Sequence, residues 1–280
     1  MSANTDSVAA MVAASGRDPQ ETVGPIPPRM RVATIEKLAV NAVMAGCKPA
    51  YFPVVLAALD AVLDDNIRLY GIQTATNTSS ALLIVNGPIV KELGLNARGN
   101  VFGQGNRANA SIGRALQLIL RNVGGDLPGE TDMATHGHAG KFSFCIAENE
   151  DESPWEPLHV ERGFNAADTA VTVTAVEGPR LVGCGAGYSS AEDVMFILAD
   201  AIAMLGSNTI AGGDMVLTVS PMAAKNLSDA GLSKADVKRG IARLATRVVR
   251  DVKRRRSISE QHPMHWSKIT DANKDDAQHP

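Results

Sequence analysis

The feature that most constrains this fold is an order of segments that occurs twice along the chain. Each copy has an apolar, alanine-rich segment of helical length, then a β-branched run that ends in proline, then a short and a longer helical segment. The first copy spans about residues 34–123 and the second about residues 183–250. Such self-similarity predicts two structurally related halves. The alternative is the helix–strand–helix order that unrelated parts of any α/β protein share.

The paired segments are similar in detail as well as in order. Three pairs carry the match: the apolar helices 51–63 and 193–205, the strand-like runs LLIVNGP (82–88) and MVLTVSP (215–221), and the long helices 109–123 and 234–248. Arg114 and Arg239 occupy equivalent positions in the long helices. We therefore expect an α/β fold with two related helix–strand–helix–helix halves around a mixed sheet.

The segment between the halves has a different character. Residues 141–150 and 169–178 are rich in β-branched and aromatic residues, which predicts strands in a β-rich insert. The expected organisation has a flexible N-terminal arm (1–28), an α/β catalytic-type domain (29–256) that contains the insert (about 126–182), and a C-terminal tail (257–280).

Composition predicts a soluble cytoplasmic protein. Hydrophobic residues make up 45% of the 280 residues and charged residues 20%, an ordinary globular balance. No apolar run approaches the roughly 18 residues of a membrane span, and the start of the chain lacks a signal-peptide pattern. The three cysteines form no disulfide framework, and Cys184 in a glycine-rich bend is expected to be structural.

The net charge of −3 conceals a basic segment. Residues 234–256 carry ten basic and two acidic residues. Apolar residues recur there at helical spacing, which indicates an amphipathic helix with a solvated basic face. Because neither an aromatic stacking platform nor a known nucleic-acid motif accompanies it, we expect no nucleic-acid partner and no membrane partner.

Cys47 is a candidate nucleophile. It lies between two predicted helices, beside Lys48, where a helix N-terminus and a neighbouring positive charge would favour the thiolate. Glu36 and Lys37 interrupt the apolar helix 34–46 and join it as candidate catalytic residues, since charges in apolar surroundings need a partner or a role. The alternatives are a small buried cysteine in a tight turn and a solvent-exposed polar strip.

A glycine-rich loop precedes the helix at 110–122. Gly103, Gly105, Asn106 and Arg107 would bring backbone amides and a guanidinium to an anionic substrate. A loop that merely caps the helix is the alternative.

The densest group of chemically active residues surrounds His136 and His138. At strand spacing, these imidazoles share one face, and with one further ligand they could hold a divalent metal such as Zn, Fe or Mn. The candidates for that ligand are Glu148, Asp132, Glu150, His159 and Glu161. Hydrogen-bonding or general-base histidines are the alternative, with His138 as a catalytic residue.

An ordered loop follows the first strand of the insert. It contains Trp155 and His159 among prolines and opposite charges, which is typical of a pocket wall. We expect His159 to be catalytic and Trp155 to contact substrate. Asn86, at the end of the first strand-like run, is a further substrate-binding candidate, because ligands in α/β folds lie at strand ends.

Four blocks of sequence resemble the UGSC family of (seleno)proteins: residues 33–59, 85–88, 105–115 and 140–164. The resemblance runs over roughly residues 30–250. It implies a relation to selenoprotein subunits of the glycine and proline reductase type, with thiol or selenol attack on a small substrate. This chain has no Cys-Gly-Ser-Cys; the nearest string begins at Cys184. A separate small subunit would supply that motif, or the protein works without it.

Three functions follow as hypotheses. The first is the large subunit of a small-molecule enzyme, which binds a polar or anionic substrate and assists reduction or cleavage of a carbon–heteroatom bond with a thiol. This enzyme would be a homo-oligomer or a hetero-oligomer with a small Cys- or Sec-bearing subunit. The second is a metal-dependent hydrolase or lyase that uses the His-x-His site. The third is a non-catalytic scaffold subunit.

Overall fold

The computed structural model describes residues 4–183, 190–207, 215–254 and 278–279. The chain forms two compact units rather than the single domain expected for residues 29–256. Unit 1 comprises Met1–Asp151 and Glu156–Pro179, and unit 2 comprises Glu152–Trp155 and Arg180–Pro280. None of the helices in the described part combines enough length with enough apolar content to reach across a bilayer.

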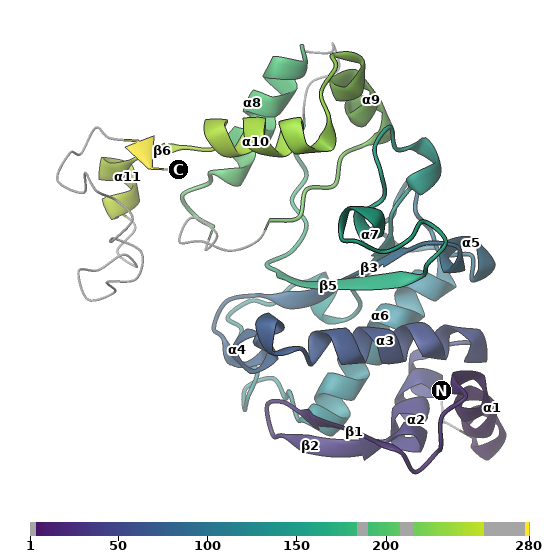
Figure 1. Ribbon diagram of the computed structural model, residues 1–280. Helices are drawn as coiled ribbons and strands as arrows, with labels where there is room; N and C mark the ends of the chain where they lie inside the picture. The colour runs from purple at the N-terminus through teal and green to yellow at the C-terminus, as the bar shows by residue number, and fades with distance from the viewer. Residues whose placement is uncertain (1–3, 184–189, 208–214, 255–277, 280) are drawn as a thin grey trace. The chain divides into compact units, whose positions relative to one another are not determined.

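Unit 1 contains the first seven helices and five strands of the chain (Figure 1). The α-helices are α1 (Thr5–Ser15), α2 (Ile35–Ala45), α3 (Phe52–Val62), α4 (Leu69–Thr74), α5 (Ile89–Glu92), α6 (Arg107–Ile119) and α7 (Leu158–Glu161). The strands are β1 (Thr22–Ile26), β2 (Arg31–Thr34), β3 (Ser80–Asn86), β4 (Cys145–Ala147) and β5 (Ala170–Val176).

The main sheet is mixed, as the sequence predicts. β3 lies between β4 and β5, parallel to β4 and antiparallel to β5. Leu83 is opposite Cys145 on one side and Val173 on the other. Both outer strands come from the predicted β-rich insert. Every residue of β3 is buried, which explains why its sequence is almost continuously apolar.

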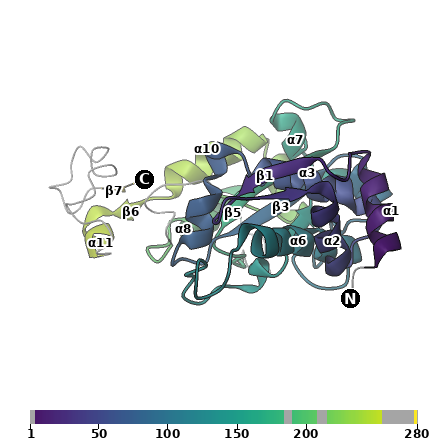
Figure 2. The same ribbon diagram turned by 90° about the horizontal axis from the view of Figure 1, so that it is seen from below.

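The two faces of this sheet are covered differently. Leu83 and Val85 belong to the main core, which α2, α3 and α6 complete. Leu82 and Ile84 point the other way, into a smaller apolar cluster with Leu158 of α7. Figure 1 shows α3 and α7 on opposite sides of β3 and β5, and Figure 2 shows α2 and α6 side by side.

Local signals fix the ends of α2. The Thr34 hydroxyl accepts a hydrogen bond from Lys37 N at 3.3 Å, and Gly46 ends the helix with a φ of 91°. The helix predicted over 34–46 is therefore confirmed.

The expected N-terminal arm is folded. α1 buries Val8 and Met11 in the main core, and β1 pairs with β2 as an antiparallel hairpin. The prediction of a loose segment over 1–28 was wrong because two buried apolar residues among alanines are enough to attach a short helix to α2.

Unit 2 is mainly helical in its described part, with one short strand pair, β6 and β7. Its elements are α8 (Ala191–Ile202), α9 (Pro221–Asp229), α10 (Lys234–Leu244), β6 (Arg247–Val248), α11 (Val249–Arg254) and β7 (Gln278–His279). Leu227, Val237 and Ile241 are buried in its core. Cys184 and most of the predicted tail lie outside the described residues.

One predicted strand of the second half is wrong. Residues 215–220 have no strand structure, and Met215 and Leu217 are 44% and 37% exposed. A β-branched run becomes a strand only where neighbouring strands pair with it, as β4 and β5 pair with β3. The helical part of the predicted repeat is present as α8, α9 and α10, and the repeat itself remains a prediction.

Candidate functional site

Three residues selected from the sequence come together where β3 and β4 end. Asn86 is the last residue of β3, Glu148 follows β4 directly, and His159 lies in α7. Because the two strands are parallel, their carboxyl ends share one edge of the sheet. With Gly87 and Glu150 these residues form what we call the carboxylate–imidazole cluster.

Hydrogen bonds hold both carboxylates of this cluster in place. Asn86 Nδ2 donates to Glu148 Oε2 at 2.6 Å and to Glu150 Oε1 at 2.8 Å. The backbone N–H of Gly87 donates to the same oxygen of Glu150 at 2.8 Å, and that of Leu158 donates to Glu148 Oε2 at 2.8 Å. Donors fixed by the backbone thus orient two acidic groups before any ligand arrives.

Gly87 is required for this geometry. Its φ is 89°, and a Cβ there would lie 2.1 Å from the carbonyl oxygen of Asp168. Only glycine tolerates both the left-handed backbone and so close a neighbour. The N–H that binds Glu150 therefore depends on this residue type.

His159 is the unusual member of the cluster. Its side chain is 1% exposed, and Nδ1 lies 3.8 Å from Glu150 Oε1. Among the described residues, neither ring nitrogen has a hydrogen-bond partner, and neither does Asn86 Oδ1. A buried polar atom without a partner costs about 1–3 kcal/mol, so these atoms indicate a missing hydrogen-bonding group.

The exposed rim beside the cluster carries opposite charges. Lys91 Nζ lies 2.7 Å from Asp151 Oδ1, and Arg98 Nη2 lies 3.8 Å from Asp151 Oδ2. The hydrogen bond from Lys91 lowers the pKa of Asp151. These groups are exposed to solvent and contribute little stability.

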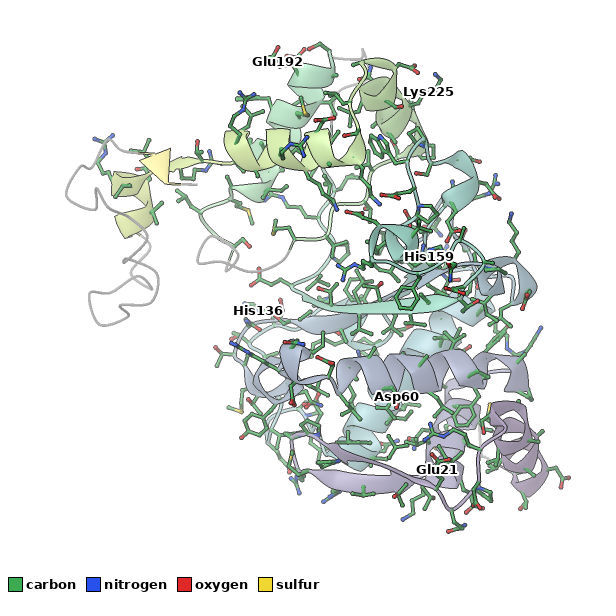
Figure 3. All side chains as sticks on the ribbon, viewed as in Figure 1. Glu21, Asp60, His136, His159, Glu192 and Lys225 are labelled. Atoms are coloured by element: carbon green, nitrogen blue, oxygen red, sulfur yellow. The ribbon has the colours of Figure 1, made fainter. Side chains whose placement is uncertain are left out.

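The predicted metal site is not assembled. Residues 136–138 form a loop rather than a strand, and His136 is exposed while His138 is partly buried. Thr135 N donates to Thr76 O, ahead of β3, whereas Glu148 lies at the far end of that strand. Figure 3 labels His136 and His159 at different ends of the sheet. In the described part of the chain, no three His, Cys, Asp or Glu residues are placed to hold a metal ion.

His138 has a local structural role instead. Its Nδ1 accepts a hydrogen bond from Gly140 N at 3.0 Å, and its ring meets that of Phe144 edge-on at 5.6 Å. Burial lowers the pKa of His138. His138 therefore begins the turn at 139–141.

Cys47 is not an activated thiol. Its Sγ donates to the carbonyl oxygen of Ser111 at 3.3 Å, inside the main core. Burial raises the pKa of Cys47 to about 11, and the positive charge of Arg107 offsets this only in part. The sequence predicted a stabilised thiolate and hence a lowered pKa for Cys47. That prediction was wrong because desolvation of a thiolate outweighs the nearby positive charge and helix end.

The charges next to this cysteine are also outside any site. Glu36 and Lys37 are exposed, as the alternative interpretation had it. The buried polar residue of α2 is Asn41, whose Nδ2 donates to Lys37 O at 2.9 Å.

The glycine-rich loop caps helices. Asn106 Oδ1 accepts from Asn109 N at 3.0 Å and so begins α6. Arg107 Nε donates to Gly46 O at 3.0 Å, at the end of α2. Gly103 and Gly105 are exposed, and Gly103 N donates to Asn100 O at 2.8 Å within the loop. Helix capping accounts for Asn106 and Arg107, and Gly103 takes part in a turn within the loop.

Trp155 belongs to unit 2. Its indole Nε1 donates to Leu232 O at 3.1 Å, and its ring packs against the helical core of that unit. This aromatic side chain therefore has a structural role in place of the predicted substrate contact.

A second polar group, the Asp126 cluster, consists of Gln73, Asp126, Asp132 and Lys141. Of these, the sequence had marked Asp132 as a possible metal ligand, and it did not mark Gln73 or Asp126. Burial, followed by the negative charge of Asp132, raises the pKa of Asp126 to about 6. Lys141 Nζ lies 2.8 Å from Asp132 Oδ1. Gln73 is 3% exposed, and its side chain lies against Asp126. No motif in the sequence marks Gln73 or Asp126.

Comparison with known proteins gives no relative: no protein-family model, no curated protein and no solved structure matches this chain. The relation to the UGSC family therefore stays a prediction.

Proposed function

We propose that the chain is a small-molecule enzyme that cleaves a carbon–oxygen or carbon–nitrogen bond by general acid–base catalysis, with His159 as the proton-transfer group. The observation that carries this proposal is the buried imidazole of His159, which has no hydrogen-bond partner among the described residues and faces a fixed carboxylate. Natural cores rarely retain such an arrangement without a ligand or a reaction that uses it.

Glu150 has the supporting role. Its carboxylate is held by Asn86 and Gly87 and would stabilise the imidazolium that forms when His159 takes a proton. The distance of 3.8 Å between Nδ1 and Oε1 would shorten in the complex, since catalytic hydrogen bonds are often long in ligand-free sites. The other ring nitrogen, Nε2, would then exchange the proton with the substrate.

The cluster favours a substrate with amino or hydroxyl groups. Two carboxylates within reach of one amide repel an anionic group at the reacting end. Asn86 Oδ1 needs a donor, which a substrate N–H or O–H would supply. The substrate is therefore polar rather than anionic at this point, and Cys47 takes no part.

Access to His159 requires α7 to move. The helix is a single turn, preceded by Pro157 and followed by Gly163, whose φ is 95°. Leu158 N attaches its start to Glu148. In the closed form the imidazole is shielded from water, which strengthens its interaction with Glu150.

A direct test compares the wild type with His159→Gln on a panel of small amino alcohols, hydroxy acids and amides, followed by proton NMR. His136→Gln is the matched control, because that histidine is exposed. We expect the wild type and the control to consume the same compounds and His159→Gln to be slower by roughly 100-fold or more. Equal rates for His159→Gln and the wild type would refute the assignment.

A further inference from the structure

A pocket of about 520 Å³ opens in unit 1 between the β1–β2 hairpin and the connection from α3 to α4. This volume is in the usual range for small-molecule sites. None of its lining residues belongs to the carboxylate–imidazole cluster. The pocket is therefore a separate feature of the molecule.

One side of the pocket is apolar. Pro25, Pro27 and Met30 line it from the hairpin, and Tyr70 lines it from α4. Met30 and Tyr70 are 56% and 58% exposed although both side chains are large. Exposed apolar groups gathered around a concavity are typical of a binding surface.

The hairpin wall is held in place before any ligand binds. Gly24 has a φ of 133°, and a Cβ there would lie 2.9 Å from Arg31 O, so the two strands of the hairpin are in close contact. Arg29 N donates to Gly124 O at 2.9 Å, and Arg29 Nη2 lies 2.6 Å from Glu130 Oε2. A preformed wall loses little conformational entropy on binding.

Charged residues of both signs line the same pocket: Asp64, Asp65 and Arg68. Asp65 and Arg68 stand at the start and end of one short turn. Neither side chain has an ion pair or hydrogen bond with the described residues, whereas the neighbouring Asp64 already accepts from Asn66 N at 2.9 Å. A bound molecule that carries one positive and one negative group could therefore pair the first with Asp65 and the second with Arg68.

We infer that this pocket binds a free amino acid with an apolar or aromatic side chain. Arg68 would bind the α-carboxylate as a fork, Asp65 would bind the α-ammonium group, and Tyr70 with the two prolines would contact the side chain. An apolar acid or an apolar amine would leave one charge of the pocket unmatched. The inference is independent of the proposed function.

Three probes separate these contributions: L-phenylalanine, 3-phenylpropanoate, which lacks the ammonium group, and phenethylamine, which lacks the carboxylate. Calorimetric titration of the full chain should give saturable one-to-one binding of L-phenylalanine, with the other two probes bound at least about tenfold more weakly. Arg68→Gln and Asp65→Asn should each weaken L-phenylalanine binding by a similar factor. Arg121→Gln, an exposed arginine outside the pocket, should bind like the wild type.

Three results would overturn the inference. They are no saturable binding of L-phenylalanine to the wild type at millimolar concentration, unchanged affinity in Arg68→Gln or Asp65→Asn, and phenethylamine bound as tightly as L-phenylalanine. The substituted side chains are exposed, so circular dichroism should show wild-type folding for each variant.

Discussion

At the scale of single residues, burial acts differently on Cys47 and His159. The thiol of Cys47 has an acceptor in Ser111 O and apolar surroundings, and burial raises its pKa. The imidazole of His159 finds no hydrogen-bond partner within the described segments and faces Glu150. Sequence spacing identified both as candidates, because it reports residue type but not what surrounds each side chain after folding.

Alkylation tests the state of Cys47. With a pKa of about 11, roughly one thiol in a thousand is ionised at pH 8. We expect iodoacetamide to label Cys47 in the folded protein at least about tenfold more slowly than in the protein unfolded in urea. Peptide mass spectrometry measures both rates, and equal rates would show that the thiol is accessible and active.

Asp126 gives a prediction about pH. Its pKa is about 6 in the folded protein against a usual 3.8, so between these values the folded state binds more protons than the unfolded state. The contribution of Asp126 to the free energy of unfolding should therefore fall as the pH rises from 4 to 7. Asp126→Asn removes this contribution, and its stability relative to the wild type should increase with pH.

Urea unfolding at several pH values measures this difference. Asp65→Asn is the control, because that carboxylate is exposed and has no partner in the described part of the chain. If wild type and Asp126→Asn had parallel pH profiles, Asp126 would not be the group that titrates near pH 6.

At the scale of elements, capping residues and β-branched runs in the sequence correctly predicted helix ends and strands. Thr34 and Gly46 mark the ends of α2, and the β-branched runs became β3 and β5. The run at 215–220 failed as a strand because nothing in its own sequence supplies a neighbouring strand.

The same reasoning explains the partial prediction of the site. Asn86, Glu148 and His159 were each selected from sequence, yet their meeting depends on β3 pairing with β4, about 60 residues later. Glu150 becomes significant only after that pairing places it against Asn86 and His159.

Gly87→Ala tests the turn that follows β3. A Cβ at Gly87 would lie 2.1 Å from Asp168 O, so the turn must move, which should weaken the bond from Gly87 N to Glu150. We expect a loss of about 2–4 kcal/mol in the free energy of unfolding. Gly105→Ala is the control, because its φ is also positive, at 108°, but nothing lies within 4 Å. Gly105→Ala should lower the free energy of unfolding by only about 1 kcal/mol. An equal loss in both variants would show that the positive φ, and not the contact with Asp168 O, causes the destabilisation.

At the scale of the whole molecule, the chain contains two units where one domain was expected. Unit 2 takes residues 152–155 from the middle of unit 1, and Trp155 packs into its helical core. The amino-acid composition did not reveal a boundary between units at residues 152–155, because the segment is short and lies within a mostly polar stretch. The amphipathic helix predicted for the basic segment is present only over α10, where Val237 and Ile241 are buried; the helix ends at Leu244, before β6 and α11.

Trp155→Ala should therefore affect one unit only. Loss of the ring and of the bond to Leu232 O should accelerate hydrogen exchange at the amides of α10 and leave the amides of β3 unchanged. Faster exchange in both elements would show that the units unfold together.

The most direct test of the account is the stability of His159→Leu. If the imidazole is kept for chemistry, replacing it with an apolar side chain of similar size loses no hydrogen bond, because neither ring nitrogen has a partner in the part of the chain that the structure describes. Urea unfolding should then give a free energy equal to or above that of the wild type. A loss of more than about 2 kcal/mol would contradict the account and show that His159 and Glu150 serve the fold instead.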